Sequence, residues 1–169
     1  MTNLLGKTLL FAGCAALGLL RGLRRHQRTE CLQGFRRALA ALGRELTFSL
    51  RPMEQLMAEA ERESQGGVAL FFQTCRRAFT QGGEESWAES WWASLETCPL
   101  PLEPEDVRLL REAGDVLGRY DGACQRQALE GLLRRLEEQA ENARETARRL
   151  FRVDLSLGLT AGLFCWILL

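Results

Sequence analysis

The chain has 169 residues, 46% of them hydrophobic, and its 22 acidic and 22 basic side chains leave no net charge. A chain of this length has room for one domain, and a neutral chain has no long-range field with which to attract nucleic acid. The charge is unevenly placed, because all the acids and all but one of the bases lie between residues 21 and 154. Only Lys7 interrupts the two apolar ends.

The apolar ends are residues 1–20 and 155–169, with charge-free stretches of thirteen residues (8–20) and fifteen residues (155–169). Ionised side chains are costly in hydrocarbon, so this layout predicts an N-terminal and a C-terminal membrane span. Residues 21–154 would form a helical domain between them, and the arginines beside both ends place that domain in the cytoplasm. Since a span needs about 20 residues, a buried core helix is the alternative for either end. A cleaved signal peptide is a further alternative for the first.

The first half of the domain shows helical periodicity, and no segment alternates at period two for long. A helix is expected to continue from the first apolar end and to stop before Pro52, because proline disfavours helix in the residue preceding it. A second helix is expected over residues 52–63, ended by Gly66 and Gly67. Third and fourth helices are expected to carry an aromatic stripe each. The predicted inward-facing residues are Leu32, Phe35, Leu39, Leu42, Leu46, Ser49, Met53, Leu56, Met57, Ala60, Phe71, Phe72, Cys75, Phe79, Trp87, Trp91 and Leu95.

The second half contains a proline-rich link at residues 98–104 and then two helices. Pro104 starts the fifth helix, which is expected to stop near Gly118. Asp121 is predicted as the N-cap of a last helix that no proline interrupts before the C-terminus. Its seam could pack on the N-terminal helix of the same chain or form a coiled coil with a second chain. The inward residues expected here are Val107, Leu110, Ala113, Leu117, Leu129, Leu132, Leu136, Ala140, Ala143, Ala147 and Leu150.

These elements predict an all-α protein: an antiparallel helical bundle between two apolar terminal helices, with the last helix long and continuous into the membrane. Three tryptophans at positions 87, 91 and 92 could line an aromatic ligand cage, but core packing is the expected role. The six cysteines are scattered without a C-x-x-C pair, which argues against zinc and against a disulfide framework. His26 is the single histidine and is expected on the surface. We therefore expect no enzymatic activity, metal or cofactor.

Three segments resemble the stage III sporulation protein AB family. The first is residues 44–48 (Arg-Glu-Leu-Thr-Phe) with Pro-Met at 52–53, and the second is residues 117–121 (Leu-Gly-Arg-Tyr-Asp) followed by Gln125. The third is Phe-Arg at 151–152 with Leu-Gly at 157–158, which opens the apolar tail. Arg51 and Tyr120 depart from the family pattern, where threonine and serine are usual.

The resemblance implies a non-enzymatic part of the channel between mother cell and forespore. In architecture the family is similar to the inner-membrane platform proteins of type II secretion and type IV pilus machines. It therefore implies a location in the mother-cell membrane, with a cytoplasmic secretion-type ATPase, other channel membrane proteins and membrane lipids as partners. A self-associating coiled-coil scaffold, and hence a homo-oligomer, is the alternative. The motif-matching residues Glu45, Asp121 and Gln125 are the candidate partner contacts, although Asp121 could instead be a cap, Glu45 an ion-pair partner and Gln125 simply solvent-facing.

Overall fold

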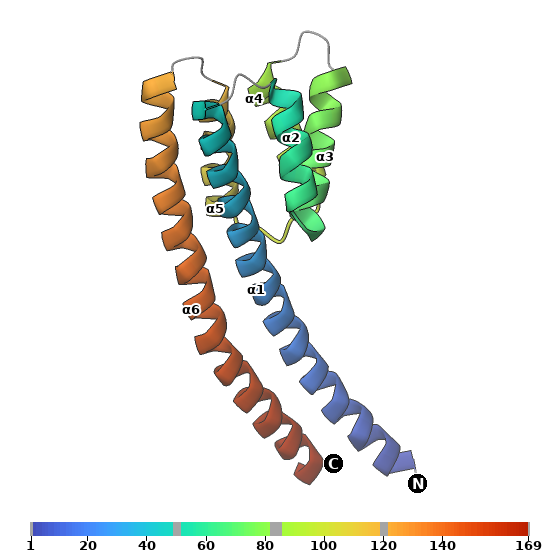
Figure 1. The fold of residues 1–169 in the computed structure, drawn as a ribbon. Coiled ribbons are helices and arrows are strands. Elements are labelled where there is room, and N and C mark those ends of the chain that lie inside the picture. The colour runs from blue at the N-terminus through green and yellow to red at the C-terminus, as the bar shows by residue number, and fades with distance from the viewer. Residues whose placement is uncertain (1, 49–51, 82–85, 119–121, 169) are drawn as a thin grey trace. The chain divides into compact units, whose positions relative to one another are not determined.

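The computed structural model describes residues 2–48, 52–81, 86–118 and 122–168. In these residues it contains six α-helices and no strand, so the all-α prediction is confirmed. Figure 1 labels the helices. The helices are α1 (Thr2–Phe48), α2 (Met53–Glu63), α3 (Gly66–Gln81), α4 (Trp87–Thr97), α5 (Pro104–Leu117) and α6 (Gly122–Leu168). The chain divides into two compact units, unit 1 (Met1–Thr29 with Glu141–Leu169) and unit 2 (Glu30–Ala140).

Several helix boundaries of unit 2 coincide with proline or glycine residues. Pro52 lies just before α2, and Pro104 is the first residue of α5, where its missing N–H costs no hydrogen bond. Gly66 has a φ of +57°, which an L side chain rarely adopts, and α3 begins there. The two glycines predicted to end the second helix therefore open the third, because α2 has already ended at Glu63.

In unit 2, α1 and α6 run antiparallel along each other. The guanidinium of Arg36 lies 2.7 Å from the carboxylate of Glu137, and the side chain of Leu129 lies directly against Gly43. The predicted seam of the last helix thus packs within its own chain. The buried residues of this seam are Leu32, Phe35, Leu39 and Leu42 on α1 and Leu129, Leu132, Leu136 and Ala140 on α6. The side chain of Leu46, together with Ser49, lies outside the described residues.

An aromatic cluster fills the centre of unit 2. Phe71 on α3 makes edge-to-face contacts with Phe35 on α1 (ring centroids 5.0 Å apart) and with Trp91 on α4 (4.7 Å). The indole N–H of Trp91 donates to the Leu110 carbonyl on α5 at 2.7 Å. Trp91 is fully buried, and buried indoles usually have such a partner, although the buried N–H of Trp87 has none among the described residues. Trp87 and Trp91 are therefore core residues, as expected, and the partly exposed Trp92 does not close a cage with them.

Gly114 in α5 and Gly118 directly after its last residue allow the tryptophans of α4 to approach the backbone. A Cβ placed on Gly114 would come within 2.7 Å of Cγ of Trp91, and one on Gly118 within 3.2 Å of Cδ1 of Trp87. Contacts that short are rarely tolerated between side chains in close-packed proteins, so both rings occupy space that glycine leaves open. Residues 114 and 118 are thus a packing slot for α4.

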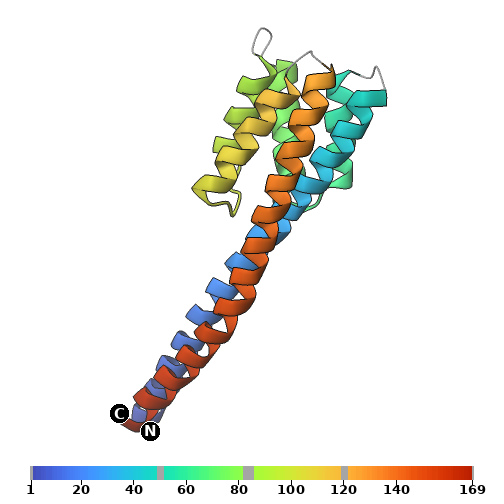
Figure 2. The same ribbon diagram turned by 90° about the vertical axis from the view of Figure 1, so that its left-hand side faces the viewer.

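A ring of helix contacts closes the bundle. Arg135 on α6 pairs with Glu112 on α5 at 2.8 Å, and Arg111 on α5 pairs with Glu96 on α4. Helix α2 packs on α3, where Glu61 and Arg76 form an ion pair at 3.1 Å. Figure 2 shows the helices of unit 2 from a second side.

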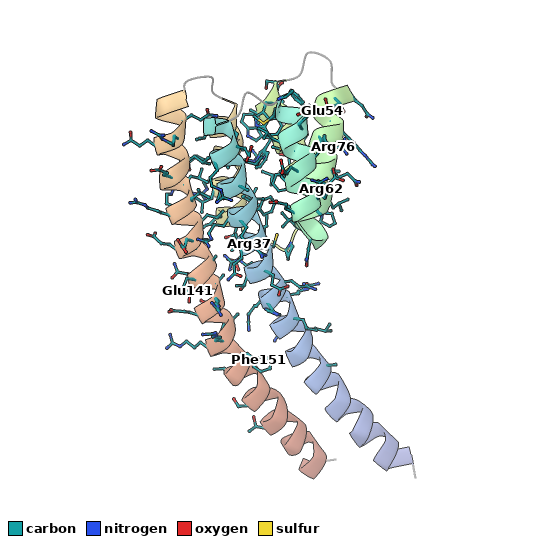
Figure 3. The ribbon with its side chains drawn as sticks, viewed as in Figure 1. Arg37, Glu54, Arg62, Arg76, Glu141 and Phe151 are labelled. Carbon is teal, nitrogen blue, oxygen red and sulfur yellow. The ribbon has the colours of Figure 1, made fainter. Side chains whose placement is uncertain are left out.

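Unit 1 consists of the first part of α1 and the last part of α6. The ring of Phe151 approaches Gly22, where a Cβ would lie 3.0 Å from Cδ2 of the ring (Figure 3). Phe151 is still 44% exposed, and Leu20, Leu23 and Val153 are exposed as well. Glu141 and Arg144 form an ion pair at 3.9 Å on one face of α6.

The predicted continuation of the last helix into a membrane is wrong. In the residues that the structure describes, no helix contains a stretch both long enough and apolar enough to cross a membrane, and this applies to α1 as well as α6. Both helices have 47 residues, so each is long enough overall to cross a membrane, and the shortfall lies in their apolar stretches. Their charge-free stretches of thirteen and fifteen residues fall short of the roughly 20 that a span requires.

Candidate functional site

Two of the three predicted contact residues, Glu45 and Gln125, belong to one end of unit 2, where α1 ends and α6 begins. The register set by Arg36–Glu137 and Gly43–Leu129 brings the last turns of α1 beside the first turns of α6. Glu45 and Gln125 therefore lie at the same end of the bundle. Asp121 lies outside the described residues, and the prediction that it caps the last helix lies there too.

Gln125 has a structural role that the sequence analysis missed. Its side-chain N–H₂ donates to the carbonyls of Val116 and Leu117, both at 3.1 Å. Both carbonyls belong to the last turn of α5, where the carbonyls run out of N–H donors further along the helix, and the Val116 carbonyl also accepts from the N–H of Gly118. Gln125 thus ties the start of α6 to the end of α5 instead of simply facing water.

Glu45 is half-buried on α1 and takes part in an interaction within the chain. Its neighbours on the surface at this end are basic. Arg44 on α1 and Arg126 on α6 are both exposed.

The bundle contains a buried acid, Asp106, that the sequence analysis did not include among the inward-facing residues. Asp106 is fully buried in the first turn of α5. One carboxylate oxygen accepts from the backbone N–H of Glu103 at 2.9 Å, and the other accepts from the side-chain N–H₂ of Gln139 on α6 at 3.1 Å. The spacing 106, 110, 113 and 117 would have revealed this inward position, and the predicted Val107 is only partly buried.

Two of the buried thiols, Cys31 and Cys75, are poorly suited to nucleophilic or ligand chemistry. Burial raises the pKa of Cys31 to about 12, helped by the negative charge of Asp106. Burial also raises the pKa of Cys75 to about 12, although a hydrogen bond with Ser94 opposes the rise. Because the thiolate is the reactive form, both cysteines are inert at neutral pH. His26 is exposed, and within the described ranges no cluster of three or more His, Cys, Asp or Glu side chains could hold a metal ion.

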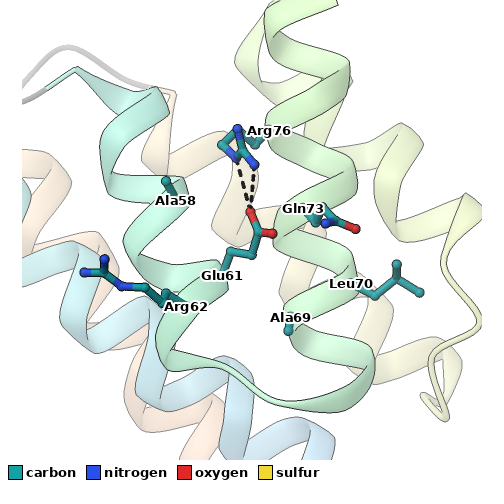
Figure 4. A pocket seen from close by; sticks show the side chains of 7 residues that line it. All are labelled: Ala58, Glu61, Arg62, Ala69, Leu70, Gln73 and Arg76. Carbon is teal, nitrogen blue, oxygen red and sulfur yellow. Dashed lines mark hydrogen bonds and ion pairs between the residues drawn. The ribbon is translucent and has the colours of Figure 1, made fainter.

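A shallow groove of about 570 Å³ runs between α2 and α3 on the surface of unit 2 (Figure 4). The ion pair between Glu61 and Arg76 bridges the two helices across it. The sequence analysis did not single out this surface. The residues that line it are Ala58, Glu61, Arg62, Ala69, Leu70, Gln73 and Arg76.

Comparison with known proteins identifies the family. The sequence profile of the stage III sporulation protein AB family matches residues 3–169. The stage III sporulation protein AB of Bacillus subtilis (strain 168) is 22% identical over 171 residues, which cover 100% of this chain and 99% of that protein. A solved structure of a stage III sporulation protein AB has a similar fold, with a TM-score of 0.68 and 21% identity, over 72% of this chain and 97% of its own. The chain therefore belongs to the stage III sporulation protein AB family.

Proposed function

We propose that the protein is a non-enzymatic adaptor of the channel between mother cell and forespore. It would link a cytoplasmic secretion-type ATPase to the membrane proteins of that channel. The observation that carries the proposal is the family match over residues 3–169. The ATPase and the channel proteins come from the similarity of the family's architecture to the platform proteins of secretion and pilus machines.

The construction of unit 2 supports a docking role. Ion pairs between neighbouring helices, such as Arg36–Glu137 and Arg135–Glu112, reinforce a bundle whose core is aromatic and close-packed. A domain of this kind presents a preformed surface, and a rigid surface binds with less ordering cost than a flexible one. The inert thiols and the exposed His26 are in keeping with a protein that binds and does not catalyse.

The coiled-coil scaffold is the less favoured candidate. Leu129, Leu132 and Leu136 are buried within their own chain in unit 2. An intermolecular coiled coil through these positions would require α6 to leave the bundle and expose its apolar seam, which is unfavourable in water.

Location at the mother-cell membrane is also part of this proposal, and it rests on the family's resemblance to platform proteins and not on a spanning helix. Fractionation of sporulating cells tests it. The full-length protein is expected with the membranes, in contact with the other channel proteins or with lipid. Recovery of the protein entirely in the soluble fraction would contradict this location.

Co-purification of the full-length protein with the secretion-type ATPase of the same cells tests the adaptor role. We expect association, and a reversal of charge at the bundle end (Arg44→Glu with Arg126→Glu) should weaken it. Arg77→Glu is the matched control, because Arg77 is equally exposed on α3. If neither the wild-type protein nor any variant associates with the ATPase, the adaptor role is refuted.

The candidate contacts can be separated from structural residues in the same assay. Gln125→Ala is expected to cost about 1 kcal/mol of stability, because two carbonyls of α5 lose their donor. It should leave ATPase association unchanged wherever the protein stays folded. Glu45→Ala and Asp121→Ala test the other two positions directly. If Gln125→Ala abolishes association without a change in stability, its structural assignment is wrong.

A further inference from the structure

The two units of the chain carry opposite charge at neutral pH. Unit 1 contains nine basic and three acidic residues, a net charge of +6, whereas unit 2 contains thirteen basic and nineteen acidic residues, a net charge of −6. The neutrality of the whole chain therefore conceals a concentration of positive charge in unit 1. The acids of unit 1 are Glu141, Glu145 and Asp154, so residues 1–29 contain none.

Most of this positive charge lies at one level of unit 1. The contact of Phe151 with Gly22 places residues 20–28 of α1 beside residues 144–153 of α6 (Figure 3). We call these two segments the basic belt. They contain eight of the nine bases of unit 1, and Glu145 is the one acid in their sequence. The arginines of the belt with exposed side chains, among the residues that the structure describes, are Arg21, Arg24, Arg144, Arg148 and Arg149.

Large apolar side chains are exposed within the same belt. Leu20 is 57% exposed and Leu23 is 48% exposed, and Phe151 and Val153 are exposed to a similar extent. Among the described residues, the other large apolar side chain with such exposure is Leu70 in unit 2. Exposed apolar side chains that gather among charged ones mark an interaction surface. The partner of the belt must therefore satisfy guanidinium groups and cover apolar side chains at the same time.

A membrane surface that contains anionic phospholipid meets both requirements. Its phosphates attract basic side chains, and the boundary between headgroups and acyl chains accepts apolar ones. Arginine suits this position, because its stem can lie along apolar surface while its head stays at the phosphate level. The charge-free residues 8–20 and 155–169 also adjoin the belt on the same side, the second stretch across Asp154. Nucleic acid would match the charge but would leave Leu20 and Leu23 in water.

We propose that the basic belt of unit 1 binds the surface of a membrane that contains anionic phospholipid. The exposed arginines contact phosphate groups, and Leu20, Leu23 and Phe151 enter the boundary between headgroups and acyl chains. This contact does not require a helix that crosses the bilayer. The inference rests on the proposed membrane location and assigns that location to lipid charge, independently of the channel proteins and of the ATPase.

Flotation of lipid vesicles tests the proposal. The full-length protein is synthesised in a cell-free system with vesicles of phosphatidylcholine alone or of phosphatidylcholine mixed with phosphatidylglycerol. Flotation at increasing lipid concentration then gives the partition coefficient. We expect this coefficient to be at least about tenfold higher for the anionic vesicles, and high salt should remove the difference because it screens exposed charges. Equal partitioning into both kinds of vesicle overturns the proposal.

A charge-removing variant tests the belt itself. It combines Arg21→Gln, Arg24→Gln, Arg148→Gln and Arg149→Gln, and should lower the partition coefficient for anionic vesicles on the order of a hundredfold. The matched control removes the same charge from four exposed arginines of unit 2 and should keep the wild-type coefficient. It combines Arg62→Gln, Arg77→Gln, Arg108→Gln and Arg134→Gln. Unchanged binding by the belt variant, or an equal loss in the control, overturns the proposal.

The apolar side chains of the belt allow a second test. Leu20→Gln with Leu23→Gln should lower vesicle binding roughly tenfold at low and at high salt, whereas Leu70→Gln in unit 2 should leave it unchanged. Vesicle binding that is insensitive to the double variant refutes the role of the apolar side chains.

The vesicles contain no other protein, so this inference and the adaptor role fail separately. Vesicle binding without association with the ATPase refutes the adaptor role and leaves the belt intact. A protein that stays with the membranes of sporulating cells but does not bind anionic vesicles refutes the belt. Its location then depends on the channel proteins.

Discussion

The fit of Trp91 against Gly114 allows a sharp test of the core packing. In the variant Gly114→Ala, the added methyl group would lie 2.7 Å from Cγ of Trp91. The ring cannot rotate away, because it is fully buried against Phe71 and its N–H is bonded to the Leu110 carbonyl. Either α4 and α5 must separate or the indole must move and give up this hydrogen bond.

The expected magnitude follows from three opposing effects. Overpacking a close-packed core costs about 1–3 kcal/mol, and weakening the buried indole hydrogen bond costs about 1 kcal/mol. Alanine is favoured over glycine inside a helix by about 1 kcal/mol, which offsets part of this loss. We therefore expect Gly114→Ala to lower the free energy of unfolding by about 1–3 kcal/mol.

Gly131→Ala is the matched control for this prediction. Gly131 is an exposed glycine inside α6, and a Cβ there would meet nothing within 4 Å. The same substitution should therefore stabilise the protein by up to about 1 kcal/mol through helix propensity alone. Urea unfolding followed by tryptophan fluorescence and by far-UV circular dichroism measures both variants. If Gly114→Ala proves neutral or stabilising, the assignment of residue 114 as a packing slot is wrong.

Three further predictions concern polar groups. Asp106→Ala should cost about 1–3 kcal/mol, because two partly buried donors lose a buried acceptor, whereas the exposed Glu105→Ala should cost less than about 0.5 kcal/mol; equal urea midpoints for the two variants would contradict the buried role. Cys31 and Cys75, with pKa values of about 12, should resist alkylation at mildly alkaline pH in the folded protein and react once it is unfolded in urea. Mass spectrometry of the labelled peptides checks this, and rapid labelling of the folded protein would refute it. Hydrogen bonds with Ser86 lower the pKa of Glu89 below 4.5 in the folded state. The Glu89 carboxylate therefore stabilises the fold at a pH above the pKa that it has in the unfolded chain. This contribution disappears as the pH falls through the lower pKa of the folded state. Thermal unfolding should thus show Glu89→Gln to be less stable than wild type at neutral pH and equal to it in strong acid, and a difference that persists in acid would exclude the proposed cause.

Much of the helical architecture was predictable from local signals. Pro52 and Pro104 act on their own neighbours in the chain, so helices start beside them whatever the tertiary surroundings. The spacing of Leu32, Phe35 and Leu39 predicted a buried face that the structure confirms. The motif segments also indicated the family, because a motif is a run of neighbouring residues and needs no knowledge of how the helices pack.

The membrane prediction shows where a charge pattern can mislead. The absence of charge from the two ends of a chain is typical of membrane spans. It does not by itself provide the length of apolar helix that a bilayer requires. Residues 8–20 and 155–169 are both too short by this measure. The correction therefore comes from counting consecutive apolar residues and not from the separation of charge.

The sequence by itself determined the helical class, most helix boundaries and the family, because each depends on neighbouring residues or on a linear pattern. Only the tertiary structure showed that Gln125 bonds to the end of α5 and that Gly114 receives Trp91. These facts depend on how far each helix is rotated about its axis, and that rotation is set by partners distant in the chain. The groove between α2 and α3 has the same origin, since Glu61 and Arg76 become neighbours only when the two helices pack.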